Sequence, residues 1–151
     1  MTKHISAAAL AAVLALVSPY SPGPFAQGAA TKAVLTPVAD LKWIGAGVPG
    51  VETAAVKGDM AKGASHFYLK YAAGFAAPVH HHSPDHYVTT VAGNLVLIVD
   101  GKEHRLPPGS YFAFTGKAKH AARCEGADAC VMFIDARGAW DVVLPKAKAA
   151  K

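Results

Sequence analysis

The sequence predicts a single all-β domain, a sandwich or barrel built from short strands. Short apolar or alternating segments follow one another, and Gly, Pro, Asn and Asp separate them about every eight to twelve residues. Beyond residue 30, no segment keeps the apolar period of an amphipathic helix. A length of 151 residues allows one domain and little more.

Residues 1–30 are predicted to be a secretory signal peptide that is not part of the fold. Lys3 precedes the apolar run ISAAALAAVLALV, and prolines and small residues follow that run. The run is too short to cross about 30 Å of hydrocarbon, which takes roughly 20 helical residues. A buried N-terminal helix is the alternative. We therefore expect a mature domain over residues 31–151 of an exported bacterial protein, periplasmic or secreted, without membrane insertion after cleavage.

Within residues 31–151, hydrophobic patterning and turn residues predict the strands. Residues 65–71 alternate, and residues 95–99 are apolar throughout, as in a buried strand. Asp100-Gly101 predicts a two-residue hairpin turn, from which residues 102–106 return antiparallel. Residues 45–64 are rich in glycine and are expected to form an irregular surface loop. The other expected strands are 87–91, 111–114, 118–124, 130–135 and 140–144.

Composition and motifs exclude several classes of function. The net charge is +5, but the basic residues are scattered singly, so no nucleic-acid partner is expected. Neither a P-loop nor a G-x-S-x-G motif occurs, so P-loop nucleotide binding and serine-hydrolase chemistry have no motif support.

The two cysteines are predicted to form a disulfide. If the protein is exported, Cys124 and Cys130 lie in an oxidising compartment. Two cysteines at this spacing in such a compartment favour a disulfide. The turn residues Gly126 and Asp128 between them would let the sulfurs face each other across a hairpin. Two reduced, buried thiols are the alternative.

The histidines carry most of the functional information. In a strand, residues two apart share a face, so His80 and His82 point one way and His81 points the other. A turn then ends the strand, and His86 begins the next one, which can return beside the first pair. His120 arrives from another strand. Imidazole is a good ligand for Fe, Zn, Cu and Ni and, less so, for Mn, so we expect one divalent transition metal inside the domain.

From Gly74 to Cys124 the chain resembles the cupin superfamily, whose fold is a small jelly-roll β-barrel. The first cupin motif is G-(x)5-H-x-H-(x)3-4-E-(x)6-G, and this chain matches it at Gly74, His80, His82 and Gly93, with His86 in place of the glutamate. Similarity to the second motif falls on Gly101, Pro107, Gly109 and His120, and the usual asparagine is replaced by Cys124. The resemblance therefore implies a single-domain cupin-type barrel.

A narrower resemblance links the chain to exported single-domain bacterial cupins. The layout is also similar to the cupin half of zinc-dependent anti-sigma factors. The regulatory role of that group is not expected here, because it depends on a helical zinc-binding half that this sequence does not show.

The resemblance implies that a divalent metal is held by His80, His82, His86 and His120. His86 stands where a carboxylate is usual, and Asp85 is adjacent, but the spacing to His82 and Gly93 favours His86. Asp85 is then a turn residue or a partner for an imidazole N–H. A three-histidine site with open positions and a metal-free, exposed hairpin are the alternatives.

The remaining histidines and aromatic residues have simpler interpretations. His66 is expected to be a partly buried residue, or else to line the barrel mouth, and His104 is expected to be solvated. Trp43 and Trp140 are expected to pack at the ends of the barrel. Most tyrosines should lie in the core, although the hydroxyl of Tyr87 or Tyr111 could lie near the metal.

Two classes of function follow. One is an enzyme, either an O₂-dependent dioxygenase or a metal-assisted isomerase or hydrolase, acting on a small oxygenated molecule. The other is a non-enzymatic metal or small-ligand binder or sensor. Four neutral imidazoles leave the metal its full charge, so an anionic ligand such as a carboxylate or enolate should bind. The expected partners are thus a small molecule and, by resemblance only, a second copy in a homodimer.

Overall fold

The computed structural model describes residues 32–146, and these residues form β-strands and one short 3₁₀ helix, η1 (Val38–Asp40). The predicted signal peptide, residues 1–30, lies outside the described residues. Within residues 32–146 we find no helix that is long and apolar enough to cross a membrane. The strands are β1 (Ile44–Gly45), β2 (Val51–Lys57), β3 (Ser65–Tyr71), β4 (Ala76–His80), β5 (His86–Ala92), β6 (Asn94–Val99), β7 (Lys102–Leu106), β8 (Tyr111–Phe114), β9 (His120–Glu125) and β10 (Cys130–Ala136).

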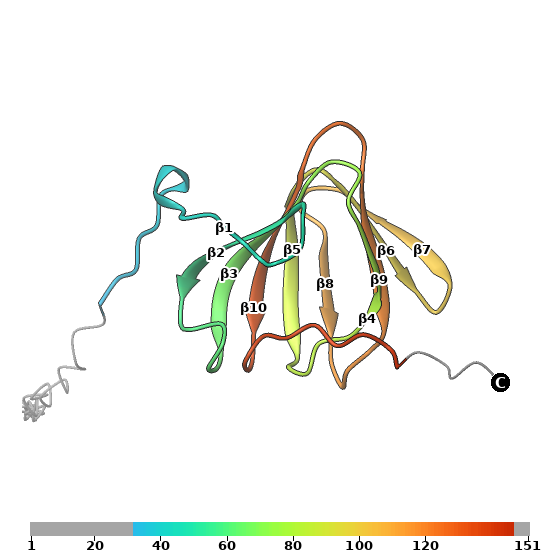
Figure 1. Ribbon diagram of the computed structural model, residues 1–151. Helices are drawn as coiled ribbons and strands as arrows, with labels where there is room; N and C mark the ends of the chain where they lie inside the picture. Colours follow the sequence, from blue (N-terminus) through green and yellow to red (C-terminus); the bar gives the residue numbers. More distant parts are fainter. Residues whose placement is uncertain (1–31, 147–151) are drawn as a thin grey trace, which may run out of the picture. The chain divides into compact units, whose positions relative to one another are not determined.

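The strands form two antiparallel sheets (Figure 1). One has the order β1-β2-β3-β10-β5-β8 and the other the order β4-β9-β6-β7. Their inward residues, such as Phe67 of β3, Leu95 of β6 and Ile134 of β10, make one buried hydrophobic cluster. The expected all-β jelly-roll is therefore confirmed, with one refinement: no hydrogen-bonded ladder closes the two sheets into a barrel among the described residues.

Strands with clear patterning lie where the sequence predicts them. β3 covers the expected residues 65–71, and its burial alternates from Ser65 to Tyr71. β6 and β7 pair with Leu95 opposite Leu106 and Val99 opposite Lys102. Between them, Asp100 and Gly101 have positive φ angles of 50° and 74°. A two-residue hairpin turn that follows the right-handed twist of the strands requires positive φ at both residues.

Two predictions of local structure are wrong. Residues 45–64 are not an irregular loop, because β2 lies there, hydrogen-bonded to β3, with Thr53 and Ala54 buried. Residues 140–144 are not a strand: only Val143 pairs, in an isolated bridge with His81. In both cases pairing with distant residues, rather than local propensity, decides the structure.

The glycines between β1 and β2 match the spacing of a dinucleotide-binding motif. Gly45, Gly47 and Gly50 follow the pattern G-x-G-x-x-G. That motif requires a strand before it and a helix after it. Here the glycines connect two antiparallel strands, so they do not form such a site.

The predicted disulfide between Cys124 and Cys130 is present, but it does not span a hairpin. Cys124 belongs to β9 in one sheet and Cys130 begins β10 in the other, so the bridge joins the two sheets. Both residues are buried. Gly93 packs against this corner, where a Cβ atom would lie 2.5 Å from the Ala129 carbonyl oxygen, and only glycine fits.

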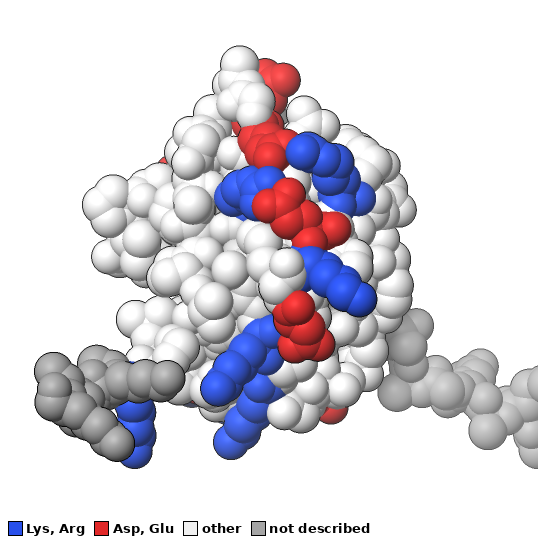
Figure 2. All heavy atoms as spheres, turned by 90° about the vertical axis from the view of Figure 1, so that its right-hand side faces the viewer, with Lys and Arg blue, Asp and Glu red and all other residues white. Residues whose placement is uncertain are grey.

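Charged residues on the outer face of the four-stranded sheet are paired. The Arg123 guanidinium binds Glu103 and Glu125, and Arg105 also binds Glu125. Figure 2 shows basic and acidic side chains alternating in one band on this face. The face therefore presents paired charges rather than a continuous positive surface.

Removal of the disulfide should destabilise the fold by about 2 kcal/mol, the loop-closure entropy expected for so short a loop. The measurement is urea unfolding of the wild type and of a Cys124→Ala, Cys130→Ala variant, each with and without reductant. Reductant should lower the midpoint for the wild type alone. An equal effect of reductant on both proteins would contradict the prediction.

Candidate metal centre

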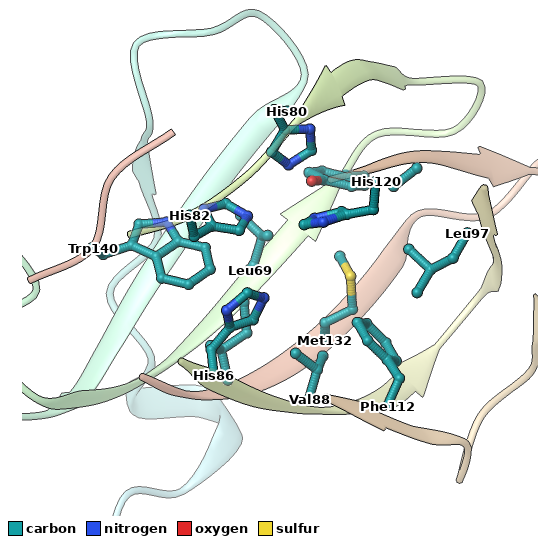
Figure 3. A pocket seen from close by; sticks show the side chains of 13 residues that line it. Leu69, His80, His82, His86, Val88, Leu97, Phe112, His120, Met132 and Trp140 are labelled. Atoms are coloured by element: carbon teal, nitrogen blue, oxygen red, sulfur yellow. The ribbon is translucent and has the colours of Figure 1, made fainter. Parts of the chain in front are cut away.

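Four histidines meet between the two sheets, at one end of the strands (Figure 3). His80 ends β4, His120 begins β9, and the two are direct partners in the antiparallel register. His82 lies just beyond β4, and His86 is the first residue of β5. All four are buried, with between 3% and 6% of their surfaces exposed. The structure thus places the four predicted residues around one cavity.

The turn between His82 and His86 is braced by Asp85. The Asp85 carboxylate accepts a hydrogen bond from the Gly116 N–H at 3.0 Å, and its carbonyl accepts one from the Arg137 N–H. The Asp85 carboxylate makes no hydrogen bond to an imidazole in the described structure. Of the two roles considered for Asp85, the turn residue is the one that the structure supports.

Each of the four imidazoles has a backbone carbonyl beside Nδ1. For His80, His86 and His120 the carbonyl belongs to the residue two positions earlier, at 2.7, 3.2 and 3.1 Å. For His82 it belongs to Asp141, at 2.5 Å. A carbonyl oxygen only accepts, so Nδ1 carries the proton and donates. The lone pair of each neutral ring is therefore on Nε2, the nitrogen that remains for a metal.

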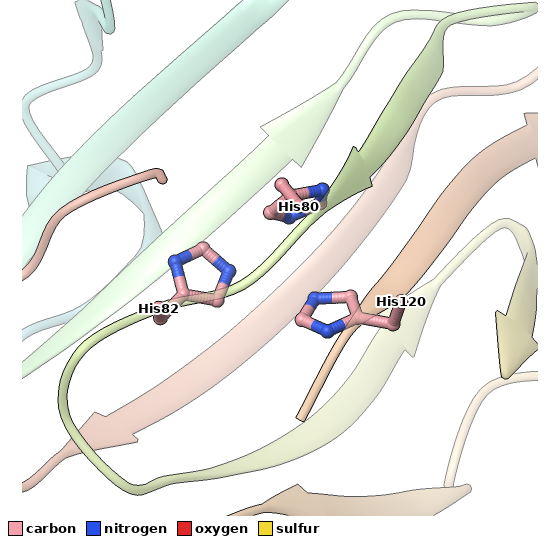
Figure 4. Close-up of side chains that lie close together, drawn as sticks. All are labelled: His80, His82 and His120. Carbon is pink, nitrogen blue, oxygen red and sulfur yellow. The ribbon is translucent and has the colours of Figure 1, made fainter. Parts of the chain in front are cut away.

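Three of these imidazoles form a compact cluster that is able to hold a metal ion. The ligating atoms of His80, His82 and His120 lie within 4.8 Å of one another (Figure 4). His86 is outside this group but close to it. The centre of its ring is 4.8 Å from that of His82 and 6.2 Å from that of His120.

Aromatic and aliphatic side chains form the walls of the cavity. Trp140 stacks on His82 with ring centres 3.9 Å apart, and Phe114 stacks on His120 at 4.0 Å. No carboxylate or basic amine lines the cavity in the part of the chain that the structure describes. The cavity leaves about 30 Å³ accessible to the centre of a water molecule, which is room for about two waters. The non-histidine lining residues are Leu69, Tyr71, Val88, Leu97, Phe112, Ala122, Met132, Ile134 and Trp140.

Burial keeps the four imidazoles neutral. Desolvation, together with a smaller effect of repulsion from the other rings, lowers the pKa of His82 to about 3 and that of His120 to about 4. Desolvation also lowers the pKa of His80 and His86. The carbonyl partners oppose these shifts, but burial dominates. The lone pairs on Nε2 are thus available at neutral pH.

The one hydroxyl in the cavity lining belongs to Tyr71. Burial raises the pKa of Tyr71 to about 12. The phenol therefore stays protonated at neutral pH, and it can donate a hydrogen bond but cannot act as a base.

Other residues considered from the sequence lie away from the cavity. His66 faces outward from β3, where Asp135 Oδ1 lies 3.4 Å from its Nε2, and His104 is exposed on β7. Tyr87 packs outward under Arg137, and Tyr111 is 63% exposed, so neither hydroxyl is near the histidines.

The contacts of Trp140 and Asp141 with His82 are not predicted from the sequence. Trp140 is expected only to pack at an end of the barrel, but its indole stacks directly on this histidine of the site. Asp141 supplies the carbonyl for His82 from 59 positions away. No local sequence motif predicts this contact. The only sequence feature that points to it is a tryptophan next to an aspartate after the last strand.

The metal-free protein should lose stability as the pH falls from about 7 to about 4. The unfolded histidines have an ordinary pKa near 6.5, whereas in the fold the pKa of His82 is about 3 and that of His120 about 4. In this window the unfolded chain binds more protons, so protonation favours unfolding. Thermal melts of the metal-free wild type should show a steeper decline than those of a His82→Phe, His120→Phe variant. If the melting temperatures of the two proteins fell equally with pH, His82 and His120 would not be the source of the pH dependence.

Comparisons with known proteins agree with this architecture. A family model described as Cupin domain matches residues 67–135. KdgF from Halomonas sp. is 20% identical, with a TM-score of 0.59 over 70% of this chain and 94% of that one. The polyketide cyclase RemF from Streptomyces resistomycificus is 16% identical, with a TM-score of 0.61 over 77% and 88%. An RmlC-like cupin from Ralstonia eutropha is 25% identical, with a TM-score of 0.57 over 71% and 69%.

No protein of curated function matches the sequence. The structural neighbours support the fold and leave the activity open. The match over β3 to β10 and the two facing antiparallel sheets together show that residues 67–135 form a cupin domain.

Proposed function

We propose that this protein is an exported cupin that holds one divalent transition metal at His80, His82, His86 and His120 and binds a small oxygenated molecule there. A metal-dependent oxygenase or related enzyme is the function that we favour. The observation that supports the metal site is the set of four buried imidazoles, each with Nδ1 bound to a carbonyl and Nε2 left for a ligand.

The donor set restricts the metal by its chemistry. Neutral imidazoles suit Fe, Zn, Cu and Ni, whereas Mg²⁺ and Ca²⁺ prefer several oxygen donors, and among the described lining residues the Tyr71 hydroxyl is the only side-chain oxygen. Because no ligand is charged, the ion keeps its full charge in apolar surroundings. An anionic oxygen ligand, such as a carboxylate or enolate, is thus the class of molecule that the site would favour.

The residues of this chain contribute positioning rather than acid–base chemistry. The aromatic faces of Trp140 and Phe114 hold the planes of two imidazoles and exclude water. Tyr71 can donate a hydrogen bond to a bound oxygen atom. When bound, the metal would supply Lewis acidity or, if it is redox-active, a site for O₂.

A non-enzymatic metal or small-ligand binder, such as a sensor, is the second candidate. The observation in its favour is the small cavity, which has room for about two waters and no side-chain base. A coordinatively filled site would store or sense the metal without turnover. An enzyme needs at least one coordination position that an outside molecule can occupy.

His86 decides between a four-ligand and a three-ligand site. It lies at the same cavity, and its Nδ1 is bound in the same way as that of His80 and His120. We include His86 because a ring centre 4.8 Å from that of His82 allows both residues to reach one ion. Without it, the site would have an additional open position.

Metal analysis of untagged protein tests the proposal directly. We expect about one transition-metal ion per chain in the wild type and none in a His82→Ala, His120→Ala variant. His104→Ala, on the exposed strand β7, is the matched control and should keep the metal. Loss of the metal in His86→Ala as well would support the four-ligand site. No metal in the wild type after attempted reconstitution would refute the proposed function.

Azide binding to the Co²⁺-substituted protein distinguishes the two candidate functions. An open position predicts a saturable change in the visible absorption of Co²⁺ as azide binds. We expect that change in the wild type, because three or four histidines leave positions of an octahedral ion open. No spectral change up to molar azide would instead favour the storage or sensing role.

A further inference from the structure

We propose that Asp141 is a positioning residue that couples closure of the C-terminal segment to metal binding at His82. The segment comprises residues 137–144, called the C-terminal strap below. It follows β10 and runs across the ends of the strands (Figure 1). The inference rests on the proposed metal site and adds to it a dependence on a part of the chain that lies far from the histidine motif.

His82 is held differently from the other three histidines. His80, His86 and His120 each donate Nδ1–H to the residue two positions earlier, so their orientation is set within their own segment. His82 donates to the Asp141 carbonyl. If the strap left its place, His82 alone would lose its hydrogen-bond acceptor.

The side chain of Asp141 fixes that carbonyl in place. Its carboxylate accepts the Ser83 N–H at 2.7 Å and the Ser83 hydroxyl at 2.6 Å. Ser83 is the next residue after His82. The Asp141 carbonyl therefore binds the His82 ring, while the Asp141 carboxylate binds the main chain directly after His82. The two contacts lock the strap and His82 together.

Trp140 extends the same contact over the ring. Its indole stacks on His82 with planes 21° apart and meets His86 edge-on, with ring centres 5.1 Å apart. Figure 3 shows the indole beside His82, at the margin of the group of histidines. Trp140 thus closes the cavity only when the strap is in place.

The strap is attached by few main-chain bonds. Among the described residues, it pairs through the bridge of Val143 with His81 and through single bonds from Trp140 N–H to Met60 and from Arg137 N–H to Asp85. Opening the strap would break far fewer bonds than removing a strand. An opening of this kind would admit a ligand larger than the space in the closed cavity.

Coupling between the strap and the metal must be reciprocal. A strap that orients His82 raises metal affinity, and a bound metal, which fixes His82, must favour the closed strap to the same extent. Residues that hold a ligating histidine through its other nitrogen typically contribute about 10- to 100-fold to metal affinity. A substitution of Asp141 leaves its main-chain carbonyl in place and removes only the carboxylate that anchors it to Ser83, so its effect should lie at the lower end of this range.

The test uses the full protein and Co²⁺ as the probe, with affinity measured by chelator competition. Asp141→Ala should weaken binding by about 10-fold, because the carbonyl remains but its anchor on Ser83 is lost. Asp141→Asn retains one acceptor oxygen for Ser83 and should fall between that variant and the wild type. Val142→Ala, at an exposed neighbouring position of the strap, is the matched control and should bind like the wild type.

Fluorescence of Trp140 separates positioning from a loss of fold. In a Trp43→Phe background, Trp140 is the only tryptophan, and bound Co²⁺ should quench it strongly in the wild-type strap. At saturating Co²⁺, Asp141→Ala should show much weaker quenching, because the indole is no longer held against His82. The metal-free melting temperatures of Asp141→Asn and Val142→Ala should be similar, so that Asp141→Asn tests the coupling even if Asp141→Ala folds poorly.

The outcomes separate the two proposals. If the wild type binds no metal, the proposed function fails. If it binds metal but Asp141→Ala and Asp141→Asn bind as tightly, with unchanged quenching, the metal site stands and the coupling by Asp141 is overturned.

Discussion

The candidate site depends on one constraint, that a buried imidazole needs a partner for each of its nitrogens. In this protein the backbone satisfies Nδ1 in all four cases, so Nε2 of each ring is the nitrogen that remains for a ligand. A polar nitrogen that faces an apolar cavity is costly unless it has a partner. A single ion bound in the cavity would serve several of these nitrogens at once.

Burial and stacking serve that arrangement in different ways. Desolvation lowers the pKa of each imidazole, so the lone pairs are free at neutral pH. Phe114 lies almost parallel to the His120 ring, with 5° between the planes, and removes most of the freedom of that side chain. The site is therefore arranged before any ligand arrives, which reduces the ordering cost of binding.

The sequence predicted what is encoded locally. The alternation in residues 65–71, the Asp100-Gly101 turn and the placement of His80 and His82 on one face all appear as expected. β2 was missed because its sequence VETAAVK is only weakly apolar, and its structure comes from pairing with β3. Residues 140–144 have the composition of a strand, but the neighbouring chain offers them only one bridge.

The tertiary contacts of the site were beyond sequence reasoning for the same reason. The hydrogen bond from His82 to Asp141 joins segments 59 positions apart, and nothing in either segment specifies the other. The cysteine pairing was predicted, but the bridge joins two sheets rather than a hairpin, because β9 and β10 belong to different sheets. Local patterns thus identified the residues, and topology decided which of them meet.

That topology closes the two ends of the domain differently. Cys124 and His120 face inward on the same strand, four residues and about 13 Å apart, so the disulfide ties the sheets together away from the histidines. At the histidine end, the closure is made by the C-terminal strap, through hydrogen bonds and one indole. Separating the sheets at the disulfide requires breaking a covalent bond, whereas lifting the strap does not. The contacts that close the histidine end also order the site, because Trp140 stacks on His82 and the Asp141 carbonyl accepts the Nδ1–H of the same ring.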